Sequence, residues 1–148
     1  MHAYSDVYAY YIERNQGQLF MDIRDALPGV DEKWFIAAYM KSAVRDKLDR
    51  ANPKYAALPP GELIDKFIAD ECGGEYRRGK KWGGFIPEWA GRIYSLYQWQ
   101  HNIPSARLIE LLTLDDMERI YPALHQMGFD AALDKIHNVV LATQSKTR

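Results

Sequence analysis

Cysteine is nearly absent from this chain: Cys72 stands alone among 148 residues. An intrachain disulfide framework and a zinc site built on several cysteines are therefore excluded, and one unpaired thiol suits a reducing compartment. Apolar runs are also short of the roughly 18 residues that a membrane span needs. The first residues lack the basic and apolar regions of a signal peptide. We therefore expect a cytoplasmic protein with no membrane segment.

An excess of charge of either sign is lacking as well. Lys and Arg number 19 against 20 Asp and Glu, which gives a formal net charge of −1. No global field marks the chain as a polyanion binder, so any contact with nucleic acid must rest on a local basic patch. Apolar residues make up 47% and charged residues 26%, which are ordinary values for a globular protein and exclude disorder of the whole chain.

Alternation of apolar and polar residues, the pattern of a half-buried strand, is missing, whereas helical spacing recurs almost everywhere. The sequence predicts an all-α protein, a single compact bundle of about six to eight helices. Gly17 is expected to end the first helix, and Ser105 and Thr113 to cap two short helices, the second with Asp116 in a capping box. The other expected helices cover residues 6–15, 18–26, 32–50, 63–72, 87–101 and 131–142.

The longest of these helices, 32–50, has an apolar stripe that includes Trp34. The stripe lies opposite a basic face formed by Lys33, Lys41, Arg45 and Lys47. The whole chain, 1–148, is expected to form one helical domain, with N-terminal helices in 1–72 and C-terminal helices in 87–142. Between them lies a glycine-rich basic loop, 73–86.

That loop, which reads GGEYRRGKKWGGF from residue 73, is the best local candidate for binding. Four cations, Arg77, Arg78, Lys80 and Lys81, fall within five residues and precede Trp82. Such a combination can contact phosphates and stack on bases, or dock on an acidic protein surface. A third interpretation is a solvated connection from which Trp82 and Phe85 turn back into the core. The spacing does not match a P-loop.

Tyrosine is abundant, with ten in the chain, and four of them surround one short helix. Tyr4, Tyr8, Tyr10 and Tyr11 cannot all point inward from a single helix, so at least two should be exposed. Tyrosine rings are frequent in binding hot spots. Tyr8 and Tyr11 are therefore candidate partner-binding residues.

No catalytic set, metal site or cofactor motif is apparent. The four histidines show no metal-binding spacing, and Cys72 lies on an apolar helix face where cysteine acts as a small hydrophobe. We therefore expect a protein that is not an enzyme and that needs no metal or cofactor. The weaker alternative is an enzyme whose site forms from Tyr121 and His125 with an acid such as Glu88 or Asp134.

The C-terminal part of the chain carries three short aromatic motifs between Trp89 and Val139. They are Trp89-Ala90-Gly91, then Tyr97-Gln98-Trp99, then Ile120-Tyr121-Pro122-Ala123-Leu124-His125. In these motifs the chain resembles a family of short uncharacterised proteins from anaerobic gut bacteria, whose genes lie among toxin–antitoxin or mobile-element genes. The resemblance implies an antitoxin or accessory regulator, and it assigns no catalytic residue.

Taken together, these features predict a small interaction protein of bacterial or phage origin. It would bind and neutralise or regulate a protein partner, as an antitoxin or a counter-defence inhibitor does. The alternative is a nucleic-acid-binding regulator that uses the basic loop, residues 77–82.

Overall fold

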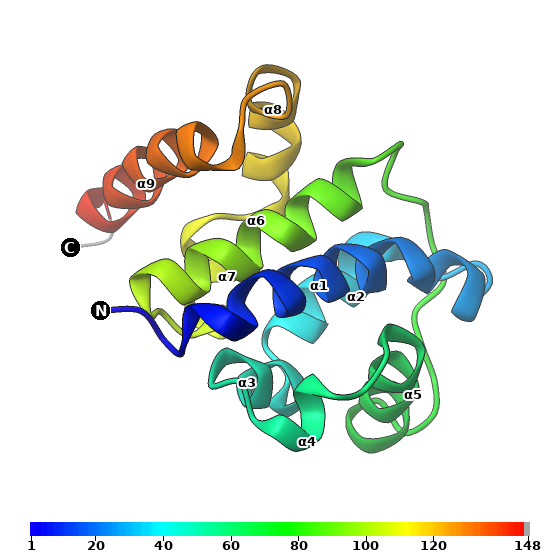
Figure 1. Cartoon of the computed structure of the whole chain (residues 1–148). Helices are drawn as coiled ribbons and strands as arrows, with labels where there is room; N and C mark the ends of the chain where they lie inside the picture. The colour runs from blue at the N-terminus through cyan, green and yellow to red at the C-terminus, as the bar shows by residue number, and fades with distance from the viewer. Residues whose placement is uncertain (147–148) are drawn as a thin grey trace.

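The structure is a computed structural model that describes residues 1–146, and its regular elements there are nine helices (Figure 1). The all-α prediction is confirmed, although the number of helices exceeds the expected six to eight. No helix in this part of the chain is long and apolar enough to cross a membrane. The helices are α1 (Asp6–Ala26), α2 (Glu32–Met40), α3 (Ala43–Asp49), α4 (Pro53–Ala56), α5 (Pro60–Glu71), α6 (Ile86–His101), α7 (Ser105–Leu111), α8 (Leu114–Leu124) and α9 (Phe129–Lys146).

The centre of the fold is an antiparallel pair formed by α1 and α6, which lie side by side in Figure 1. Gly91 of α6 sits so close to α1 that a Cβ there would lie 2.8 Å from the carbonyl oxygen of Gln16. The Gln16 side chain uses this proximity, because its Nε2 donates a hydrogen bond of 2.8 Å to the Gly91 carbonyl. Glycine at position 91 therefore sets the distance between the two helices.

Gly17 does not end a helix, and this corrects the prediction of separate helices over 6–15 and 18–26. α1 runs unbroken from Asp6 to Ala26. A Cβ on Gly17 would lie 2.6 Å from Cγ of Arg92 and 3.1 Å from the Glu88 carbonyl oxygen, both on α6. The glycine allows close helix packing, a role that its sequence neighbours do not reveal.

The single helix predicted over 32–50 is also wrong, because the chain breaks at Lys41 and Ser42 into α2 and α3. The Ser42 hydroxyl accepts a hydrogen bond of 3.0 Å from the Arg45 backbone N–H and so caps α3. The Glu71 carboxylate, at the end of α5, accepts from two further backbone N–H groups in the first turn of α3, those of Ala43 and Val44. Glu71 lies 27 or more residues away in the sequence, so helical periodicity could not indicate that it caps α3.

Arg45 is not part of an exposed basic face, because its side chain is fully buried. Its guanidinium donates to Asp49 Oδ1 at 3.0 Å and to the side-chain oxygen of Gln16 at 2.6 Å. Gln98 of α6 and Ser105 of α7 accept from it at 3.3 Å and 3.1 Å. One buried cation therefore joins α1, α3, α6 and α7.

The same network explains why Ser105 does not cap α7 as expected. Pro104 occupies the N-cap position, and Ser105 is the first helical residue. The Ser105 backbone N–H donates to Asp49 Oδ2 at 2.8 Å, and its hydroxyl donates to Asp49 Oδ1. The aspartate of α3 therefore takes the capping role.

Other predicted features are confirmed. The helix predicted over 87–101 begins one residue earlier, at Ile86, so that Pro87 lies in its first turn, and Thr113 and Asp116 form the expected capping box at the start of α8. α5 extends the predicted helix over 63–72 toward its N-terminus, to Pro60. These features depend on residues close together in the sequence, which is why the sequence sufficed to find them.

The close crossing of α1 and α6 generates a stability prediction. Gly91→Ala should lower the free energy of unfolding by about 1–3 kcal/mol, because the added methyl group forces two packed helices apart. Gly61→Ala is the matched control, since a Cβ at this helical glycine of α5 meets nothing within 4 Å. The control should be neutral or slightly stabilising, because alanine favours helix. Urea unfolding of the two variants measures the difference, and equal effects would refute the close-packing role.

Candidate functional site

The basic loop does not hang free in solvent. It runs alongside the residues that precede α2, through hydrogen bonds from the Asp31 N–H to the Arg77 carbonyl (2.8 Å) and from the Glu32 N–H to the Lys80 carbonyl (3.1 Å). In the opposite direction, the Gly79 N–H donates to the Gly29 carbonyl at 3.1 Å. Residues of the loop therefore have fixed positions over the start of α2.

Glycine is required at position 79 by the closeness of Asp31. A Cβ on Gly79 would lie 2.7–2.8 Å from atoms of the Asp31 side chain. That side chain is already engaged, because it caps α2 by accepting from the Trp34 N–H at 3.1 Å. It also lies 3.6 Å from Arg77 Nε. The Asp31 carboxylate therefore both caps α2 and contacts Arg77 of the loop.

Trp82 anchors the far end of the loop, so very little of the side chain that was expected to contact a partner is accessible. The residue is only 2% exposed. Its indole N–H donates to Glu118 of α8 at 2.9 Å, and its backbone N–H donates to Glu32 at 3.0 Å. Glu32 is itself buried and pairs with Arg24 at 2.9 Å. Trp82 thus turns back into the core, as one of the three interpretations of the loop predicted, whereas Phe85, which the same interpretation also placed in the core, is 68% exposed.

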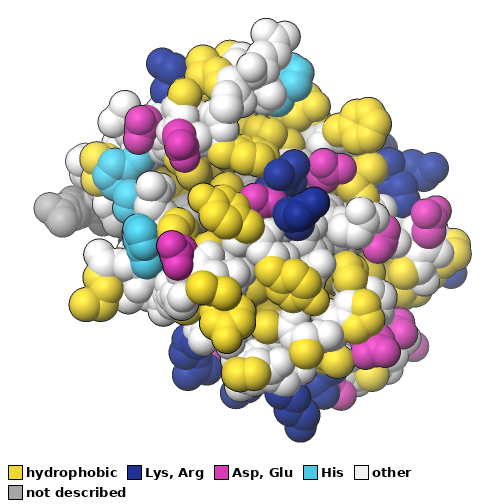
Figure 2. Space-filling view, in the orientation of Figure 1, with side chains coloured by type: hydrophobic (Ala, Val, Ile, Leu, Met, Phe, Trp, Pro, Cys, Tyr) yellow, Lys and Arg dark blue, Asp and Glu magenta, His cyan; other side chains and the backbone are white. Residues whose placement is uncertain are grey.

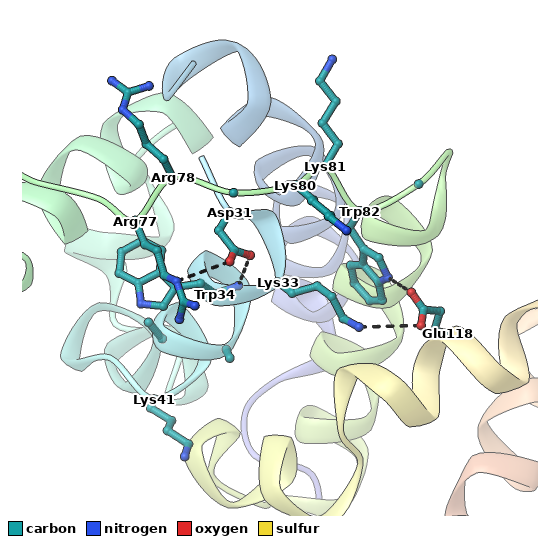
Figure 3. Close-up of a pocket in the computed structure, with 14 residues that line it drawn as sticks. Asp31, Lys33, Trp34, Lys41, Arg77, Arg78, Lys80, Lys81, Trp82 and Glu118 are labelled. Carbon is teal, nitrogen blue, oxygen red and sulfur yellow. Dashed lines mark hydrogen bonds and ion pairs between the residues drawn. The ribbon is translucent and has the colours of Figure 1, made fainter. Parts of the chain in front are cut away.

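Between the loop and α2 lies an open hollow of about 960 Å³, which we call the basic groove. Figure 3 shows Arg78 and Lys81 extending outward from the loop, and Lys41 at the end of α2 beyond Trp34. Trp34, Ala37 and Ala38 give the groove an apolar wall. Its charged lining consists of Lys33, Lys41, Arg77, Arg78, Lys80 and Lys81, with Asp31 and Glu118.

The cations of the groove differ in how far they are neutralised. Lys33 donates to Asp115 at 2.7 Å, and this hydrogen bond raises the pKa of Lys33 and lowers the pKa of Asp115. By contrast, Lys41, Lys80 and Lys81 have no acidic partner within 4.0 Å in the described part of the chain, whereas Lys33 and Arg77 do. These three lysines give the groove positive charge that the fold leaves uncompensated.

The two predicted groups of binding residues lie in different places. Arg77, Arg78, Lys80 and Lys81 are exposed at the groove, whereas Tyr8 and Tyr11 are on the N-terminal half of α1, away from the loop in Figure 1. Tyr8 and Tyr11 are 51% and 50% exposed, and Tyr10 is 64% exposed. The prediction that at least two of these rings are exposed is confirmed, but the structure does not join them to the loop in one site.

Sequence reasoning missed three residues of the groove: Lys33, Trp34 and Lys41. It placed Trp34 in an apolar stripe and the two lysines on the basic face opposite that stripe. The eight-residue spacing of Lys33 and Lys41 puts them on a similar side of a helix, which was the available signal. Their role becomes visible only once the loop is placed across α2.

No protein-family model, no curated protein and no solved structure matches this chain. Across residues 1–146, no three side chains of the types that ligate metals gather in a metal-binding arrangement.

The shared carboxylate of Asp31 yields a prediction about the loop. Gly79→Ala should displace the Asp31 side chain and weaken the α2 cap, which lowers the free energy of unfolding by about 0.5–2 kcal/mol. Gly83→Ala adds the same methyl group to the same loop, where it meets nothing within 4 Å. Thermal unfolding of both variants provides the comparison. If Gly83→Ala proved as damaging as Gly79→Ala, the contact with Asp31 would not be the reason.

Proposed function

We propose that the protein is a binding protein that docks an acidic segment of a protein partner in the basic groove, and so neutralises or regulates that partner. The observation that supports this most directly is the uncompensated charge of Lys41, Lys80 and Lys81 around one hollow. Charge complementarity of this kind steers association and selects partners. The proposal assigns no catalytic residue.

The apolar wall of the groove adds a second requirement for the ligand. Trp34 is half-buried and lines the groove together with Ala37 and Ala38. In the sequence these three residues lie between Lys33 and Lys41, which also line the groove. A segment that fits would carry carboxylates for the lysines and an apolar side chain for this wall. Acidic peptides with interspersed apolar residues have this chemistry, and a large indole is a common centre of such contacts.

The alternative, a nucleic-acid-binding regulator, is favoured by one feature: four exposed cations within residues 77–81. Two features count against it. Asp31 and Glu118 line the same groove and would repel closely spaced phosphates, and the net charge of the chain is −1. A peptide can place its carboxylates away from these two acids, so we favour the protein partner.

The test compares a fluorescein-labelled peptide of alternating glutamate and leucine with a labelled DNA duplex, by fluorescence anisotropy on the full chain. The double variant Lys80→Ala/Lys81→Ala should weaken peptide binding about ten-fold, because two uncompensated charges are lost. The control Lys54→Ala/Lys135→Ala removes two exposed lysines that do not line the groove, and should leave binding unchanged.

Two results would contradict the proposal. If both double variants weakened peptide binding equally, the interaction would depend on overall charge and not on the groove. If the duplex bound more tightly than the peptide, with a salt dependence that the loop variant reduced, the nucleic-acid alternative would replace it.

A further inference from the structure

A second hollow, of about 480 Å³, lies where the start of α6 meets the end of α8 and the start of α9. We call it the aromatic pocket. Its size is in the range of small-ligand sites. Its principal lining residues are Phe85, Glu88, Trp89, Arg92, Tyr121 and Phe129. Figure 2 shows basic and acidic side chains next to hydrophobic side chains over α6.

The aromatic rings of this pocket are held in place by one another. Trp89 packs edge to face against Tyr121, with ring centroids 5.4 Å apart. Tyr121 stacks in turn on His125 at 4.2 Å. Phe85, by contrast, is 68% exposed and lines the same pocket. The pocket therefore presents an ordered aromatic wall and one free ring.

Three of the residues named in the enzyme alternative, Glu88, Tyr121 and His125, line this pocket. The fourth, Asp134, does not. Their geometry is not that of an acid–base relay. Tyr121 and His125 meet through their ring faces, and Nδ1 of His125 is 2.6 Å from the Tyr121 backbone carbonyl. The arrangement is better suited to holding a ligand.

The charges of the pocket favour a cation. Arg92 is already neutralised, since its Nε donates to the buried Glu13 at 2.6 Å. The Glu88 carboxylate has only a long ion pair with the same guanidinium, at 3.9 Å. Two carboxylates thus surround one guanidinium, and Glu88 keeps its capacity to accept hydrogen bonds. Arg14, which shares a neighbouring hollow with Glu88, forms no ion pair with it.

Arg92 also shows how a guanidinium fits among these rings. Its Cζ lies 4.5 Å from the centroid of the Phe129 ring, a cation–π contact. Guanidinium groups are planar, stack on aromatic faces and bind carboxylates through two parallel hydrogen bonds, which an ammonium cannot do. An entering arginine would find a ring at Phe85 and a carboxylate at Glu88, one helical turn apart.

We propose that the aromatic pocket binds an arginine side chain of a partner polypeptide, with the guanidinium on Glu88 and against the exposed ring of Phe85. The inference does not require the basic groove to bind anything. It does give the chain two sites of opposite charge preference, one lined by residues 77–83 and the other by Phe85 and the start of α6.

NMR spectroscopy of the ¹⁵N-labelled full chain tests this, with N-acetylarginine amide as the probe and the uncharged N-acetylcitrulline amide as its isostere. The arginine probe should shift the indole N–H resonance of Trp89 and the backbone amides of Glu88 and Phe129. It should bind about ten-fold more tightly than the citrulline probe.

Variants locate the contact. Glu88→Gln and Phe85→Ala should each weaken the arginine probe about five-fold. Glu62→Gln is the matched control, because it removes an exposed glutamate from the first turn of α5, as Glu88 lies in the first turn of α6, and it should have no effect.

Equal shifts from the two probes, or an unchanged affinity in Glu88→Gln, would overturn the inference. Shifts confined to residues of the basic groove would overturn it as well. None of these outcomes bears on whether the groove binds acidic peptides, so the two proposals fail separately.

Discussion

The buried guanidinium of Arg45 is the constraint on which the arrangement of the helices depends. A buried charge left without partners costs about 3–5 kcal/mol, so the side chains around it must hold their places. Asp49 supplies the opposite charge, and Gln16 fixes α1 both to Arg45 and to the Gly91 carbonyl of α6. Because Arg45 lies in α3, directly after the turn that ends α2, its network also sets where α2 can lie. The position of the apolar wall of the basic groove, which α2 provides, therefore depends on the buried Arg45 side chain.

The parts of the fold that could be predicted from the sequence are those decided by neighbouring residues. The capping box at Thr113 and the proline at the start of α6 are of this kind. Gly17 shows the limit of such reasoning, because the same residue ends a helix in one context and permits close packing in another. At Ser42 the decisive partner is Glu71, which the fold brings to the N-terminus of α3 from another helix. Tertiary contacts decided both cases.

The candidate sites follow the same division. The exposed cations of the loop were visible in the sequence because four of them fall within five residues. The sequence could not show that Trp82 is buried while Phe85 is exposed. Trp82 is held by hydrogen bonds to Glu32 and Glu118, and only the fold brings these two residues to it. Nor could the sequence show that Trp34 forms the wall of a groove. The loop thus presents its charge on one side and the free ring of Phe85 beside the aromatic pocket, while Trp82 holds it to the core.

We propose that an acidic segment docks in the basic groove and not on the exposed tyrosines of α1. Amide chemical shifts of the full chain, recorded while a peptide of alternating glutamate and leucine is added, distinguish the two surfaces. We expect the largest shifts at residues 33–41 and 77–83, and we expect these shifts to saturate together. Largest shifts at residues 7–11, with the groove unperturbed, would contradict it.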